Sequence, residues 1–281
     1  MSWKDILVFV ADIGEDEAAL ALGEELATRF DAHIAAASLT ALPDEPLAYE
    51  PTVVAGVWAE LLGRARAQAE SAHAALQAPL ARAARPVELR RAEALARDLG
   101  RVAAVHARYA DIAVLTRPGE DEGGELRAEI IEGVLFHAGR PALVAPPAWR
   151  AGASFAKRIV IAWDASREAT RALADAGPLI DGADEVTIVT VDARPKPFGH
   201  GELPGVNIAA HLERRGVDVS VRNIDGQGRS ISQALCDEVR ALNADLVVMG
   251  GYASSRLREL VFGGATRDLL RISEAPILMA H

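Results

Sequence analysis

Short apolar runs alternate with longer amphipathic stretches along the whole chain. Unbroken apolar runs of about four to eight residues are typical of strands buried on both faces of a sheet. The Ala- and Leu-rich stretches between them repeat their apolar positions every three or four residues, which predicts helices. Strands that alternate with helices predict βαβ units and a mostly parallel sheet. The pattern thus predicts an α/β protein.

The same order of elements occurs twice. Five strand candidates in the first half (5–12, 33–39, 86–94, 109–116 and 140–146) match five in the second (158–164, 186–192, 218–226, 243–250 and 275–281). A stretch rich in Pro, Gly, Ala and Ser at 146–155 separates the halves and is typical of a linker. We therefore predict two tandem, doubly wound, Rossmann-like domains with five-stranded parallel sheets, at 1–147 and 157–281, joined by a linker at 148–156.

Both halves make an excursion after the second strand. In the first half a proline-rich loop and a long helical run fill residues 40–85, whereas the second half has a shorter Gly/Pro loop, RPKPFGHGELPG. These excursions either cover the sheet or line a site. Farther on, Ser230 and Gln233 form a capping-box pattern that predicts a helix start before ISQALCDEVRAL.

Charge and cysteine content exclude several classes of function. The 30 basic and 40 acidic residues give a net charge of −10, and no Lys/Arg-rich run is present, which argues against nucleic acid as the main partner. The single cysteine, Cys236, excludes an internal disulfide and a CxxC metal site, so it fits a reducing cytosol. No signal-peptide pattern and no apolar run of about 20 residues is found. We expect a cytoplasmic protein without a membrane partner.

Candidate chemistry lies where the strands of the second half end. Ligands of open parallel sheets bind beyond the carboxyl ends of the strands, and these ends carry Asp164, Val191, 225–228 and 249–253. After the last of these, a glycine pair at 263–264 opens a helix. Glycines let backbone N–H groups approach an anion, and a helix N-terminus adds the positive end of a dipole. The alternative is that these glycines serve only tight turns.

This segment resembles the nucleotide loop of the universal stress protein family, whose ATP-binding members show G-x2-G-x9-G-(S/T). The matching frame here is Gly250, Ala253, Gly263 and Gly264, and VIAWDASREATRAL resembles the family's first strand and its Asp-x-Ser turn. The similarity covers both halves. It implies a tandem two-domain member whose domains have the adenine nucleotide α-hydrolase-like form of the Rossmann fold.

The resemblance implies a role for each matching residue. Asp164 would face the ribose and adenine, and Val191 would offer its backbone to the adenine edge. Flanking positions would complete the nucleotide contacts: Ala162, Trp163, Met249, Gly250, Gly263, Gly264 and Ala265. The implied ligand is ATP or AMP, with Mg²⁺ as the ion that would accompany ATP. From the residues alone, Asp164 is equally a candidate for an Asx turn at a strand–helix junction.

The loop departs from the family pattern at two positions. Ala253 replaces the second glycine, and its β-carbon would oppose a positive φ or crowd a phosphate. Gly264 replaces the hydroxyl residue, and Thr266, Ser254 or Ser255 are the available substitutes. A protein that keeps the fold but has lost the nucleotide is therefore the alternative.

The first half differs at the same loop. Asp12 keeps its place at the end of the first strand, but LTRPGEDEGGELRAEIIEG replaces the glycine frame. Where Gly263 and Gly264 stand, this half has either Ala128 and Glu129 or Glu129 and Ile130. Residues 1–150 contain 15 basic and 23 acidic residues, a net charge of −8, against −2 for 151–281. Acidic side chains disfavour a bound phosphate. We expect this copy to be structural or to face a partner, or to present only a solvated acidic loop.

No catalytic or metal-binding motif is present in the sequence, and no base–nucleophile pair is recognisable. We therefore expect no catalytic residues, no metal ligands and at most weak ATPase activity. Two hypotheses remain in front: a nucleotide-responsive stress regulator with unknown protein partners, and an interaction module of the same fold. The resemblance also implies pairing of the two last strands within one chain, and homodimerisation.

Overall fold

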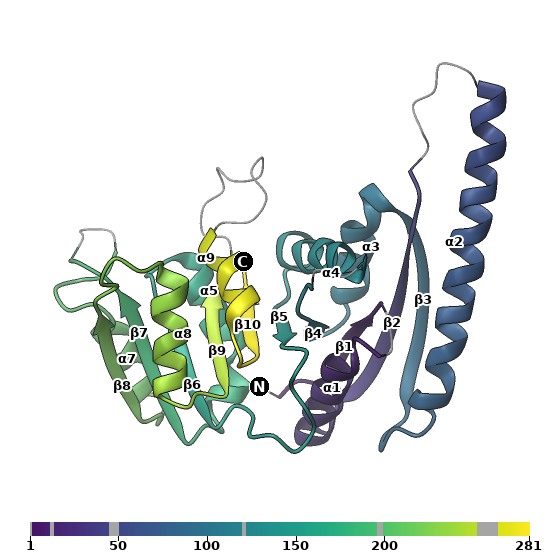
Figure 1. Ribbon diagram of the computed structural model, residues 1–281. Coiled ribbons are helices and arrows are strands. Elements are labelled where there is room, and N and C mark those ends of the chain that lie inside the picture. Colours follow the sequence, from purple (N-terminus) through teal and green to yellow (C-terminus); the bar gives the residue numbers. More distant parts are fainter. Residues whose placement is uncertain (1, 12–13, 45–50, 120–121, 196–198, 252–263) are drawn as a thin grey trace. The chain divides into compact units, whose positions relative to one another are not determined.

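The computed structural model describes all residues except 1, 12–13, 45–50, 120–121, 196–198 and 252–263 (Figure 1). The chain divides into two units. The N-terminal unit is Trp3–Arg140, and the C-terminal unit is Pro141–His281 together with Met1–Ser2.

Four parallel strands form the sheet of the N-terminal unit, in the order β3-β2-β1-β4. Their bounds are β1 Asp5–Val10, β2 His33–Leu42, β3 Val87–Leu95 and β4 Ile112–Thr116. The helical elements are α1 Glu17–Phe30, α2 Pro51–Leu80, η1 Ala96–Asp98, α3 Leu99–Ala107, α4 Glu122–Gly133 and η2 Val134–Ala138. Strands β1, β2 and β4 are almost entirely buried, as their unbroken apolar runs predict.

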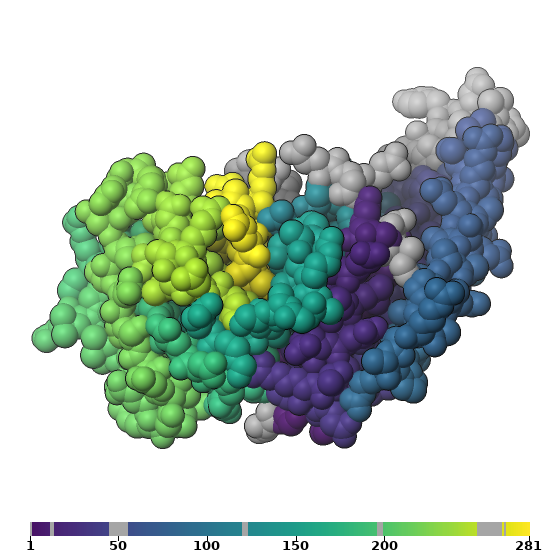
Figure 2. All heavy atoms as spheres, turned by 60° about the horizontal axis from the view of Figure 1, so that its bottom comes forward, coloured from purple at the N-terminus to yellow at the C-terminus, as the bar shows by residue number. Residues whose placement is uncertain are grey.

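The helix predicted in the long excursion of the first half is α2, which lies at the surface beside β2 and β3 (Figures 1 and 2). One stripe of it is buried or half-buried, at spacings of three and four residues, and includes Trp58, Ala69, Leu76 and Leu80. The remaining positions described along α2 are exposed. This excursion therefore covers the sheet along one narrow stripe.

The sheet of the C-terminal unit has the strand order β5-β10-β9-β6-β7-β8. Its strands are β5 Ala142–Ala145, β6 Arg158–Ala162, β7 Glu185–Val191, β8 Val219–Ile224, β9 Leu246–Gly250 and β10 Ile277–Ala280. Its helices are α5 Arg167–Asp175, α6 Gly177–Ile180, α7 Val206–Glu213, α8 Ile231–Ala241 and α9 Gly264–Ile272. Strand β5 pairs antiparallel with β10, and the other pairs are parallel.

Pairing of β5 with β10 joins the last strand of the first repeat to the last strand of the second within one chain. Leu143 lies opposite Leu278 in this pair, and both side chains are fully buried. The C-terminal unit thus begins before the linker and takes in β5.

The prediction of an alternating α/β fold with mostly parallel strands is confirmed. The predicted capping box is present at α8, where Ser230 accepts a hydrogen bond from the Gln233 backbone N–H and the Gln233 side chain accepts one from Ser230 N–H. Across the described parts of the chain, no helix is long and apolar enough to cross a bilayer.

Candidate functional site

Sheet register brings several of the predicted positions to one edge of the C-terminal unit. Ala162, the last residue of β6, lies beside Val189 of β7 and Met249 of β9. Because these strands are parallel, their carboxyl ends meet at the same edge, which is where ligands of open parallel sheets bind. We call this the strand-end edge. It brings together Trp163 and Asp164 after β6, Val191 at the end of β7, and Gly250 at the end of β9.

Asp164 builds the turn that leads from β6 into α5. Its Oδ1 accepts a hydrogen bond from Ser166 N–H at 3.0 Å, Ala165 adopts φ +61°, and Ser166 caps α5 by accepting from Ala169 N–H at 3.0 Å. This is the Asx turn that the residues alone suggested. The Asp164 side chain is nevertheless exposed, and no described residue bonds its Oδ2. One carboxylate oxygen therefore shapes the turn while the other faces solvent at the strand-end edge.

Gly250 is where α5 packs directly on a strand. A β-carbon at this position would lie 2.5 Å from Ala169 N and 2.8 Å from Glu168 C. Both are backbone atoms, so any side chain would push the helix away. Close packing of a helix is thus reason enough for a glycine here, independent of any ligand.

Two carboxylates that were given no role from the sequence hold the neighbouring turns. Asp192, directly after Val191, has φ +49°, and its Oδ1 accepts Gly226 N–H at 3.0 Å, tying the ends of β7 and β8 together. Asp225 repeats the turn of Asp164, because its Oδ1 accepts Gln227 N–H at 2.8 Å. Val191 itself is half-buried. An Asp at each strand end was the available signal, and only the one before α5 was singled out.

Two further groups near Gly250 were missed. His281 Nδ1 lies 3.0 Å from the carbonyl oxygen of Gly251. Glu168 on α5 is buried; burial works to raise the pKa of its carboxyl, but hydrogen bonds from Arg167 and its own N–H, with the charges of Arg167 and His281, outweigh this and lower the pKa. Glu168 is therefore an ionised, internally paired group behind the edge.

The phosphate end of the predicted loop is described only from the start of α9. That helix begins at Gly264 and continues through Ala265 to Thr266, whose side chain is buried. Ala253 and Gly263 lie outside the described residues, as do Ser254 and Ser255. A helix N-terminus following β9 agrees with the predicted order of strand, loop and helix.

At the corresponding edge of the N-terminal unit, charged side chains pair with one another. Arg127 on α4 pairs with Asp16 (Nε–Oδ1, 2.9 Å) and with Glu15 (Nη2–Oε2, 2.8 Å). The side chains of Arg127 and Asp16 are 4% and 2% exposed. Asp16 Oδ2 also accepts Ala11 N–H, the first residue after β1, at 2.7 Å. Asp12 lies outside the described residues.

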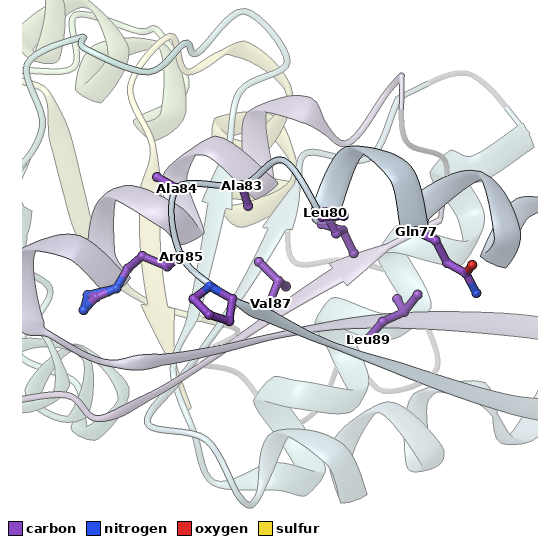
Figure 3. Close-up of a pocket in the computed structure, with 9 residues that line it drawn as sticks. Gln77, Leu80, Ala83, Ala84, Arg85, Val87 and Leu89 are labelled. Carbon is purple, nitrogen blue, oxygen red and sulfur yellow. The ribbon is translucent and has the colours of Figure 1, made fainter.

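A hollow elsewhere in the N-terminal unit is not part of this edge. It has a volume of about 510 Å³ and lies at the turn from α2 into β3, where Leu80, Val87 and Leu89 line it (Figure 3). Arg85 is held by Asp31 and by the carbonyl oxygen of Ala27, the latter at 3.0 Å. Since β3 starts here, the hollow lies at the opposite end of this unit's strands from their carboxyl ends.

Comparison with family models gives one match, to the universal stress protein family, over residues 156–281. The matched range runs from just before β6 to the end of β10. This range is similar to a universal stress protein domain. No curated protein matches this sequence.

Solved structures are similar to this chain over all or part of its length. A universal stress protein from Archaeoglobus fulgidus DSM 4304 is 16% identical, covers 98% of this chain and 95% of its own, and has a TM-score of 0.65. A functionally unknown protein from Pseudomonas aeruginosa PAO1 is 13% identical, with coverage of 99% and 92% and a TM-score of 0.54. A universal stress protein solved in complex with cAMP is 22% identical, covers 44% of this chain and 97% of its own, and has a TM-score of 0.34.

Similarity over nearly the whole chain, at 13–16% identity, shows that the fold of each unit matches these structures. The range matched by the family model contains β6, β7 and β9, whose carboxyl ends form the strand-end edge. Among the described residues, no group of His, Cys, Asp and Glu is arranged to hold a metal ion.

Proposed function

We propose that the C-terminal unit binds an adenine nucleotide, ATP or AMP, at the strand-end edge, and that the protein acts as a nucleotide-responsive stress regulator. The observation that supports this best is the register of β6, β7 and β9, which gathers Asp164, Val191 and Gly250 at one edge. In the proposed complex Asp164 faces the ribose, Val191 presents its backbone to adenine, and the start of α9 faces the phosphates.

The residues of the edge suit such a ligand. Asp164 is exposed and keeps Oδ2 outside its turn, so it can accept a hydrogen bond from a ribose hydroxyl. The N–H groups at the start of a helix suit an anion, and α9 supplies them directly after the glycine pair. Trp163, Ala162 and Met249 are half-buried beside Asp164 and offer apolar surface. Mg²⁺ would enter with ATP rather than through protein ligands.

Isothermal titration calorimetry of the full chain with ATP and AMP tests the proposal, preceded by mass spectrometry of small molecules released on denaturation. The decisive variant is Asp164→Ala, with Asp164→Asn beside it. Asn keeps an oxygen for the Asx turn but removes the charge, so the pair separates loss of the ligand from loss of the turn. We expect both substitutions to weaken nucleotide binding at least tenfold.

Asp225→Asn is the matched control, because Asp225 makes the same turn after β8 and is also exposed. It should leave the affinity unchanged. An empty protein that gives no heat with ATP or AMP would reject the nucleotide. Equal losses from Asp164→Asn and Asp225→Asn would reject the assigned role of Asp164.

The second candidate is an interaction module of the same fold without a nucleotide. Gly250 favours it, since helix packing already explains that glycine. The replacement of the motif glycine by Ala253 favours it as well. This candidate predicts that partner capture from a lysate is unchanged by Asp164→Ala.

A further inference from the structure

The sheet of the N-terminal unit ends in an open strand. β3 stands first in the order β3-β2-β1-β4, with β2 on one side of it. Its nine residues, Val87–Leu95, exceed the roughly five or six of a usual strand. No residue that the structure describes, other than those of β2, bonds to the backbone of β3. The outer N–H and C=O groups of β3 are therefore a template on which another strand can pair.

The second half of β3 projects beyond the rest of this sheet. The register of β1 with β2 ends at Val10 opposite Ser38, but β2 and β3 stay paired as far as Leu42 opposite Leu95 (Figure 1). Beyond Ser38 the sheet is thus a ribbon of two strands. Such a ribbon is marginally stable by itself, so a strand added on the open side of β3 would stabilise it.

Both faces of β3 contact helices. On one face Leu89 lines the hollow beside α2, and Arg66 of α2 places Nε 3.2 Å from Glu93. On the other face Arg90 lies near α3: burial first and the charge of Arg90 second lower the pKa of His106 on that helix. These contacts leave the outer edge of β3 as the direction from which a further strand can approach.

The side chains along β3 complement a second copy of the same strand. If two copies pair antiparallel about a two-fold axis at Ala92, Arg91 lies opposite the partner's Glu93, and Leu89 lies opposite the partner's Leu95. Within one chain Arg91 Nη2 already lies 2.9 Å from Glu93 Oε1, so the pairing makes a ring of four charges that alternate in sign. An axis at Arg91 or at Glu93 would instead place a charge opposite its own copy, which is destabilising.

The open edge of the C-terminal unit lacks this match. β8 has six residues and contains one charged side chain, Arg222, which pairs with Glu238 of α8 at 2.8 Å. A two-fold axis on β8 therefore brings no opposite charges together. Charge complementarity distinguishes β3 from β8 as a strand for self-pairing.

We propose that two copies of the chain pair through β3, antiparallel about Ala92, and join their N-terminal sheets into one. Residues 89–95 of each copy form the contact. The pairing does not depend on a nucleotide at the strand-end edge. It gives the N-terminal unit a partner-facing role, with a second copy of the chain as the partner.

Sedimentation equilibrium of the full chain over a concentration series tests the pairing. One chain has a mass of 29.8 kDa, and we expect this mass to double as the concentration rises. A chain that stays monomeric up to its highest soluble concentration would overturn the proposal. Growth into open-ended assemblies would overturn it as well, because a two-fold contact closes at the dimer.

Arg91→Glu and Glu93→Arg, each made singly, test the register. In a dimer of either variant, like charges face each other at both ends of the ring, so each should weaken self-association at least tenfold. Mixed in equal amounts, the two variants should form a heterodimer at least tenfold tighter than either homodimer, because opposite charges face each other again. Recovery in the mixture also shows that both variants fold. A mixture no tighter than the single variants, or a dimer that neither variant weakens, would overturn the proposal.

Arg222→Glu is the matched control, because Arg222 is an exposed arginine in the other open edge strand. It should leave self-association unchanged. A loss as large as that caused by Arg91→Glu would show that β8 takes part in the contact, and would overturn the pairing of β3 with itself.

Discussion

The two strand-end edges of this chain follow the same order of strands but end differently. In the N-terminal unit, Arg127 reaches the end of β1 and is neutralised by Asp16 and Glu15. In the C-terminal unit, the first strand ends in an exposed Asp164 that uses one oxygen in its own turn. In the N-terminal unit the carboxylate of Asp16 is thus paired with an internal cation, whereas in the C-terminal unit Asp164 keeps one carboxylate oxygen outside its turn. The comparison teaches that matching strand ends of the two repeats use their carboxylates in different ways.

The largest effect on stability should come from removing the cation of the buried ion pair in the N-terminal unit. Arg127→Met removes the cation and leaves Asp16 buried without its partner, which typically costs about 3–5 kcal/mol. Urea denaturation of the full chain measures the loss, and it should fall on the transition of the N-terminal unit. Arg64→Met, at an exposed ion pair with Glu60 on α2, is the control and should cost less than about 1 kcal/mol.

A second variant keeps this prediction sharp. In Arg127→Met combined with Asp16→Asn the unpaired charge is gone, while an oxygen remains for Ala11 N–H. The double variant should therefore be more stable than Arg127→Met alone. A cost for Arg127→Met no greater than that for Arg64→Met would mean that the ion pair does not stabilise the N-terminal unit.

An intermediate effect is expected where the two repeats differ at the last residue of matching strands. Gly250 ends β9, and Thr116 ends β4. Gly250→Val places carbon against the backbone of α5, so we expect a loss of about 1–3 kcal/mol or more. Thr116→Val keeps the shape and removes a buried hydroxyl that has no hydrogen-bond partner in the described part of the chain. It should be neutral or stabilise by about 1 kcal/mol.

Unfolding in urea, followed by circular dichroism, measures both variants. Gly250→Val should also weaken the binding of any ligand to the C-terminal unit, because the turn made by Asp164 leads directly into α5. Equal stability of the two variants would contradict the close approach of α5 to β9.

Much of the fold could be predicted from the sequence because strand burial leaves a direct pattern. The runs YADIAVLT and NADLVVMG repeat even the Asp that starts each strand. In the structure Asp111 accepts the N–H groups of Lys4 and Asp5, at 2.6 and 3.1 Å. Asp245 accepts those of Lys157 and Arg158, both at 2.9 Å. These paired contacts lie where the strands begin, away from the strand-end edge, and are alike in both repeats.

The site could be predicted less fully, for a physical reason. Asp164 and Val191 are recognisable because they end apolar runs, but partners distant in sequence are not. Asp16 and Arg127 are 111 residues apart, so no local pattern announces their pairing. A cavity of about 430 Å³ between α5 and α7 likewise depends on the distance between these two helices, which the apolar pattern does not specify.

The smallest effect should appear in the pH dependence of the free energy of unfolding, and it should have opposite signs in the two units. Arg167 and the Glu168 N–H lower the pKa of Glu168 below its ordinary value of 4.5 despite burial. Glu168 therefore stabilises the fold above pH 4.5, and this contribution is lost as the pH falls through the lower folded pKa. In the N-terminal unit, burial first and the charge of Glu129 second raise the pKa of Glu132. Glu132 therefore opposes folding at neutral pH, and stability is gained as the pH falls through its raised pKa toward 4.5.

Substitution by glutamine removes each contribution without changing shape. At pH 7, Glu168→Gln should lower the free energy of unfolding and Glu132→Gln should raise it, each by a small amount. The measurement is urea denaturation at a series of pH values from 7 to 3. Below pH 4.5, Glu168→Gln should lose less stability than the unmodified chain. Above pH 4.5, Glu132→Gln should lack the gain in stability that the unmodified chain shows as the pH falls. The same sign for both variants at pH 7 would mean that the carboxyls of Glu168 and Glu132 are not held in opposite ways.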